Sequence, residues 1–69
     1  ESALKVDYAI NIVVVKTIPG AAQGAAAVID ALDWPEVVGT IAGDDTIFVL
    51  SRNEKNAVNT MEKLKKLMG

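Results

Sequence analysis

Two adjacent carboxylates, Asp44 and Asp45, follow Gly43 near the middle of the chain and are the side chains best suited to bind a ligand. Gly-Asp between two β-branched runs predicts a short hairpin turn, where neighbouring side chains can converge instead of pointing to opposite faces. No Lys or Arg stands near them in the sequence. At about 4 Å and an effective dielectric of about 20, two such charges repel by about 4 kcal/mol. A planar cation, above all a guanidinium, relieves that repulsion, although an ordinary solvated turn explains the same residues.

A second candidate segment is Pro19-Gly20-Ala21-Ala22-Gln23. A glycine that leads into a helix exposes backbone N–H groups able to hold a carboxylate, and Gln23 adds a donor and an acceptor. A plain strand-to-helix turn is the simpler interpretation. Asp30 is a third acidic side chain on the same helix, and taken alone it is a solvated residue.

Composition excludes several functional classes. Among the 69 residues there is no Cys and no His, so the chain lacks disulfides, thiolate metal sites and the usual general base. The net charge of −2 argues against a phosphate-binding surface. No apolar run approaches the roughly 20 residues of a membrane span, and no signal peptide precedes the first strand. We therefore expect a soluble, cytoplasmic protein. Because the sequence opens on Glu1 and not on Met, we expect it to be a fragment of a longer protein.

Hydrophobic periodicity predicts six elements. Alternation over residues 4–8 and a β-branched run over 12–18 predict two strands joined by a short connection, with Asn11 as its turn former. An alanine-rich helix over 21–31 is closed by Trp34-Pro35, with Trp34 as a hydrophobic plug. Strands at 37–42 and 46–50 flank the acidic turn. The final helix opens with a Ser51–Glu54 capping box and ends near Gly69.

This order predicts an α+β two-layer sandwich, β-β-α-β-β-α, with one four-stranded antiparallel sheet and both helices on a single face. The second sheet face is then uncovered. A domain of this size buries only about 60% of its unfolded surface, so self-association is the expected support. We expect another copy of the chain to cover the open face.

Three segments together resemble one known family. They are Pro19-Gly20-Ala21-Ala22-Gln23, Asp30-Ala31-Leu32 and the run Gly39-Thr40-Ile41-Ala42-Gly43-Asp44-Asp45-Thr46-Ile47. With these segments the chain is similar to the C-terminal domain of bacterial arginine repressors. The resemblance extends from the Lys5-Val6-Asp7 strand to the final helix, and the nine-residue run with its Asp pair is specific.

The resemblance implies that residues 1–69 form a single domain for oligomerisation and L-arginine binding, separate from an N-terminal winged-helix DNA-binding domain. It implies trimers that stack as a hexamer, with arginine as corepressor where the trimers meet. Operator DNA is contacted only through the N-terminal domain. The protein is then a regulator of arginine biosynthesis and catabolism genes, with no catalysis, no metal and no other cofactor.

The resemblance also implies the ligand contacts. Asp44 and Asp45 take the guanidinium of arginine, while Gln23 and Asp30 contact or frame its α-amino and α-carboxylate end. Main-chain groups assist at Ala22, Thr40 and Ala42.

Other functions stay open on the residues alone. The Asp pair can hold Mg²⁺ or Ca²⁺, but calcium takes six to eight oxygen ligands and only Asp30 stands out as a further donor. A purely structural oligomerisation domain without ligand is a second alternative. Small pterin dehydratases have a similar two-layer architecture, but their chemistry relies on histidines, which this chain lacks.

Overall fold

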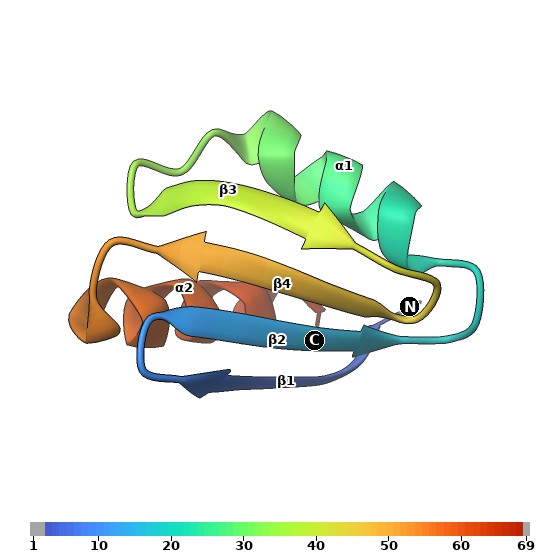
Figure 1. The fold of residues 1–69 in the computed structure, drawn as a ribbon, viewed down its shortest axis with the longest axis horizontal. Coiled ribbons are helices and arrows are strands. Elements are labelled where there is room, and N and C mark those ends of the chain that lie inside the picture. Colours follow the sequence, from blue (N-terminus) through green and yellow to red (C-terminus); the bar gives the residue numbers. More distant parts are fainter. Residues whose placement is uncertain (1–2, 69) are drawn as a thin grey trace.

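Four strands form one antiparallel sheet in the order β1-β2-β4-β3. The structure, a computed structural model, describes residues 3–68 (Figure 1). Its elements are β1 (Ala3–Ala9), β2 (Ile12–Thr17), α1 (Ala22–Leu32), β3 (Val37–Ala42), β4 (Thr46–Ser51) and α2 (Glu54–Met68). The predicted α+β class, element order and single sheet are confirmed.

The core lies between the sheet and the two helices. Alternate residues of the central strands point into it, namely Val13, Val15, Ile47 and Val49, none more than 1% exposed. Both helices contribute to the same buried cluster, so both cover one face of the sheet. β-Branched side chains fit this pleated, fully covered surface well. The residues between them on the same strands point to the opposite face of the sheet, which we call the open face.

The connection from α1 to β3 is held by α2. Trp34 is half-buried against the core, as predicted, after Asp33 ends α1 in a left-handed conformation (φ 52°). Nζ of Lys63 lies 4.9 Å from the centroid of the Trp34 ring and 2.6 Å from Oε2 of Glu36. The hydrogen bond from Lys63 lowers the pKa of the Glu36 carboxyl below its usual value. One lysine thus ties α2 to the loop that aligns β3.

The start of α2 differs from the prediction. Ser51 does not cap the helix: it is the last residue of β4, is 1% exposed, and its N–H donates to the carbonyl of Asn11. Strand pairing holds Ser51 away from α2, and the cap falls to Asn53, whose Oδ1 accepts the N–H of Asn56. The capping-box assignment was therefore wrong by two residues. The predicted terminal cap at Gly69 lies outside the described residues.

The β1–β2 turn places an unfavourable residue at its tightest point. Ile10 adopts φ 54° and is 75% exposed, whereas Asn11, the expected turn former, donates its side-chain amide to the carbonyl of Ser51. A β-branched residue in the left-handed region is strained because its side chain approaches the backbone.

Replacing Ile10 by Asn should therefore stabilise the fold. Asn tolerates the left-handed region, so we expect a gain of about 1 kcal/mol in the free energy of unfolding, measured by urea denaturation at fixed protein concentration. Ile10→Val is the matched control, because it keeps the branched side chain and the strain. Equal stability of both variants would show that the turn stores no strain.

Candidate functional site

The acidic turn is fastened to the start of α1 by its main chain. The carbonyl of Asp45 accepts the N–H of Thr17 over 2.8 Å, and the carbonyl of Asp44 accepts the N–H groups of Gly20 and Ala22 over 3.1 and 3.2 Å. We call these three hydrogen bonds the backbone clamp. Gly20 has φ 83°, a conformation that favours glycine, and this lets the chain reverse between Thr17 and Ala22. The clamp brings together the two segments singled out in the sequence.

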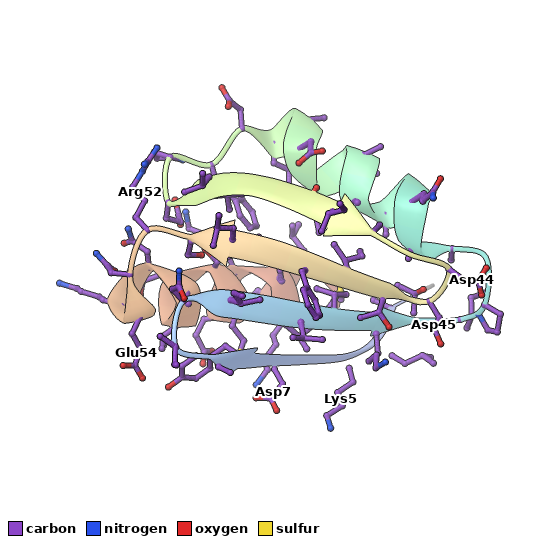
Figure 2. The ribbon with its side chains drawn as sticks, in the orientation of Figure 1. Lys5, Asp7, Asp44, Asp45, Arg52 and Glu54 are labelled. Atoms are coloured by element: carbon purple, nitrogen blue, oxygen red, sulfur yellow. The ribbon has the colours of Figure 1, made fainter. Side chains whose placement is uncertain are left out.

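Both carboxylates of the turn remain at the surface. Asp44 and Asp45 are exposed and lie together at one end of the sheet, opposite the end that carries Arg52 and Glu54 (Figure 2). Arg52 is the single arginine of the sequence, and it is remote from the turn. Because the clamp uses main-chain groups only, the charge of the turn stays available to a ligand.

One cation does reach the turn, contrary to the sequence-based expectation. Lys16 of β2 is paired with Thr46 of β4, and its Nζ donates to Thr46 Oγ1 over 2.8 Å. That hydroxyl donates to Oδ1 of Asp45 over 2.9 Å. Asp45 is thus linked through Thr46 to an ammonium, while no side-chain hydrogen bond of Asp44 occurs within residues 3–68. Sequence inspection missed both residues because the strand register, not sequence proximity, brings Lys16 there.

The outer edge of β3 carries the other predicted contacts. Thr40 Oγ1 donates to Oδ1 of Asp30 over 2.9 Å, which links β3 to α1. Gly43 donates its N–H to the carbonyl of Thr46. Because hydrogen-bonded and non-bonded pairs alternate in an antiparallel ladder, the main-chain groups of Thr40 and Ala42 point away from β4. They lie along a free strand edge between the acidic turn and Asp30.

The remaining predicted residues, Gln23 and Asp30, both lie on α1. Gln23 is exposed on the first turn of α1, next to Ala22 of the clamp, and its side chain makes no hydrogen bond within the part of the chain that the structure describes. The N–H of Ala22 is already committed to Asp44. Asp30 follows Ala22 by eight positions on α1, which is about 12 Å at the usual helical rise. It therefore does not join the acidic turn directly.

A shallow hollow of about 380 Å³ adjoins the turn on the open face. Its lining consists of Ile41, Ala42, Gly43, Asp44, Asp45, Thr46 and Phe48. A neighbouring hollow shares Ile41 and Phe48, which are 74% and 47% exposed. The surface beside the acidic turn is therefore apolar and open.

The acidic turn has no third metal-ligating side chain gathered beside it in the described part of the chain. No group of three or more acidic side chains gathers within residues 3–68 to hold an ion. Asp30, the further donor suggested by the sequence, is instead bound by Thr40. Neither helix in this part of the chain is long and apolar enough to cross a membrane.

Comparison with known proteins gives a consistent result. The sequence model described as "Arginine repressor, C-terminal domain" matches residues 1–66. The chain is 56% identical over 68 residues to an arginine repressor of Caldicellulosiruptor saccharolyticus, and 58% identical over 67 residues to one of Alkaliphilus oremlandii. It is 52% identical over 68 residues to an arginine repressor of Clostridium acetobutylicum. These matches cover 97–99% of this chain but only 45% of each relative, so the chain spans about half their length.

Proposed function

The chain belongs to the arginine repressor family, to whose C-terminal domain it corresponds, and we propose that it binds L-arginine at the acidic turn and assembles with copies of itself. The family consists of regulators of arginine biosynthesis transcription and not of enzymes. The observation that carries the proposal is the backbone clamp, which holds Asp44 and Asp45 side by side while leaving both carboxylates exposed.

A guanidinium suits these carboxylates better than other cations do. It is planar, stays charged, and presents donors in a fork that matches carboxylate geometry. Two adjacent acids linked to one lysine leave an excess of a single negative charge, which a monovalent ligand balances. A divalent ion would need further oxygen ligands.

The edge of β3 supports binding of the amino-acid end of arginine. Its α-amino and α-carboxylate groups need acceptors and donors at some distance from the guanidinium. The carboxylate of Asp30, the amide of Gln23 and the outward main-chain groups of Thr40 and Ala42 offer both acceptors and donors. The N–H of Ala22 contributes indirectly, because the clamp already uses it.

The four polar side chains of the proposed site are exposed, namely Gln23, Asp30, Asp44 and Asp45. Their exposure favours a site that a second copy completes. Small-molecule sites usually bury most of their ligand, and a free strand edge with an exposed turn cannot do so alone. Repulsion among acidic turns brought together opposes assembly without ligand. An arginine that contacts two copies removes that repulsion, so ligand binding and assembly are linked.

The open face is the proposed surface for self-association that does not require arginine. It exposes large apolar side chains, including Ile41, Phe48 and Leu50, at 74%, 47% and 41% of their surface. An exposed apolar patch on so small a domain marks an interaction surface. We propose trimers formed by this face and a hexamer formed where the acidic turns of two trimers meet.

A role in gene regulation is supported by the relatives, arginine repressors of which this chain covers only 45%. We propose that the chain is the corepressor-sensing domain of a repressor whose DNA contacts reside in a separate N-terminal winged-helix domain. A hexamer would present six DNA-binding domains in one geometry and gain affinity through multivalency. The net charge of −2 fits a domain that does not itself contact DNA.

Removing one carboxylate of the turn should abolish most arginine binding. For Asp44→Asn and for Asp45→Asn we expect a loss of about 1.5–3 kcal/mol, or about 10- to 150-fold in affinity, because an amide does not neutralise a guanidinium. Isothermal titration calorimetry measures this. Asp33→Asn is the matched control: it removes the same charge at an exposed position where Asn tolerates φ 52°. Unchanged affinity in both turn variants would place the ligand elsewhere.

Arginine should shift the assembly equilibrium. In sedimentation velocity across a dilution series, we expect arginine to raise the fraction of the larger species, because it binds that species better. Citrulline is the control, since it has nearly the same shape without the positive charge, and should have a much smaller effect. A species distribution that ignores arginine while calorimetry still detects binding would separate ligand recognition from assembly.

Introducing a charge on the open face should dissociate the arginine-independent oligomer. Phe48→Glu removes an apolar contact of about 1.5–3 kcal/mol per subunit and places a carboxylate in the interface, while the core stays intact because Phe48 lies outside it. Mass measurement by light scattering gives the oligomeric state. Val28→Glu is the control on α1, where 61% of the side chain is exposed. Dissociation by Val28→Glu but not by Phe48→Glu would assign the interface to the helices.

A further inference from the structure

Three polar side chains form a continuous chain of hydrogen bonds beside the acidic turn. The ammonium of Lys16 donates to Thr46 Oγ1, and the same hydroxyl donates to Oδ1 of Asp45, over 2.8 and 2.9 Å. A hydroxyl has one proton and two lone pairs. Because Lys16 has no acceptor, Thr46 must accept from it, and its single proton is then directed at Asp45.

We propose that Thr46, anchored by Lys16, is a positioning residue that fixes the Asp45 carboxylate for guanidinium binding and favours arginine over lysine as ligand. This inference rests on the proposed arginine binding. Thr46 holds Oδ1 of Asp45, and no hydrogen bond to Oδ2 occurs within residues 3–68. The carboxylate therefore has one oxygen held by the protein and one oxygen free for a ligand.

Positioning matters because Asp45 is exposed. An unrestrained exposed carboxylate rotates freely, and binding has to order it at a cost in conformational entropy. A guanidinium makes directional, planar contacts and gains from a carboxylate whose plane is set beforehand. The ammonium of lysine is a compact charge with rotatable donors, and it depends much less on that plane. Loss of the Thr46 hydroxyl should thus weaken arginine more than lysine.

The position of Thr46 suits this role in two further ways. It is the first residue of β4, paired in register with Lys16, so its backbone is fixed by the sheet while its side chain reaches the turn. It is also half-buried and lines the hollow beside the turn, next to Asp44 and Asp45. A hydroxyl placed in this way restrains one carboxylate oxygen of Asp45 from a backbone that the sheet holds fixed.

The test compares Thr46→Val with Thr46→Ser. Val keeps the branched shape and suits a strand but removes the hydroxyl, whereas Ser keeps the hydroxyl. By calorimetry we expect Thr46→Val to weaken arginine binding about 3- to 10-fold and Thr46→Ser to stay within about twofold of the unchanged protein. L-Lysine affinity should change less than twofold in Thr46→Val, so the arginine-to-lysine ratio falls. Thermal unfolding without ligand serves as the check on a purely structural effect.

A double-mutant cycle tests the part played by Lys16. Removing its charge by Lys16→Met has two effects: the hydroxyl loses its anchor, and a cation that repels the ligand disappears. The second effect is Coulombic and is common to both backgrounds. The difference between Lys16→Met in the unchanged protein and in Thr46→Val therefore isolates the part transmitted through the hydroxyl. We expect Lys16→Met to weaken arginine binding at least twofold more in the unchanged protein than in the Thr46→Val background. Lys55→Met, an exposed lysine on α2, is the matched charge control.

Each outcome has a definite meaning. If the unchanged protein does not bind arginine, the proposed function fails and the positioning role fails with it. If the unchanged protein binds arginine but Thr46→Val keeps the same arginine-to-lysine ratio, only the positioning role is overturned. Equal loss of arginine affinity in Thr46→Val and Thr46→Ser would show that the effect does not depend on the hydroxyl, and would also overturn the positioning role.

Discussion

The arrangement of this domain depends on two carbonyl groups in its acidic turn. The carbonyls of Asp44 and Asp45 accept three N–H groups, from Thr17, Gly20 and Ala22. These bonds join the end of β2, the start of α1 and the β3–β4 hairpin at one point. Backbone groups must find partners in a folded chain, and here the partners are supplied by a segment that reverses at Gly20. The main chain of the turn is thereby used for folding, while the side chains of Asp44 and Asp45 remain exposed.

The two faces of the sheet differ in burial for a simple physical reason. Two helices provide enough apolar surface to cover one face, and the buried residues of β2 and β4 form a continuous core there. Nothing within residues 3–68 covers the other face, although Ile41 and Phe48 expose apolar surface on it. The elements described within residues 3–68 form two layers, one sheet and one layer of helices. The remaining apolar surface therefore favours association, and the acidic turn lies at the end of that same face (Figure 2).

Errors in the sequence-based prediction trace to strand pairing. The capping box failed because pairing with Asn11 retains Ser51 in β4, so Asn53 caps α2 instead. The expectation of an acidic turn without a nearby cation failed because the register of β2 and β4 sets Lys16 opposite Thr46. The left-handed conformation fell on Ile10, whereas residue type had favoured Asn11. Each error concerns contacts between residues that are distant in sequence or a backbone angle imposed by the closing of the sheet.

Local patterns were sufficient for the element order, the α+β class and the family, because periodicity, turn residues and the nine-residue run from Gly39 to Ile47 are properties of short segments. They also singled out Asp44 and Asp45, since charge density is visible in a sequence. Only the tertiary structure decided how these carboxylates are held. The backbone clamp and the link from Lys16 through Thr46 to Asp45 join residues that lie about 20 to 30 positions apart. Such contacts form only when the strands are paired, and their register is set by the packing of the whole core.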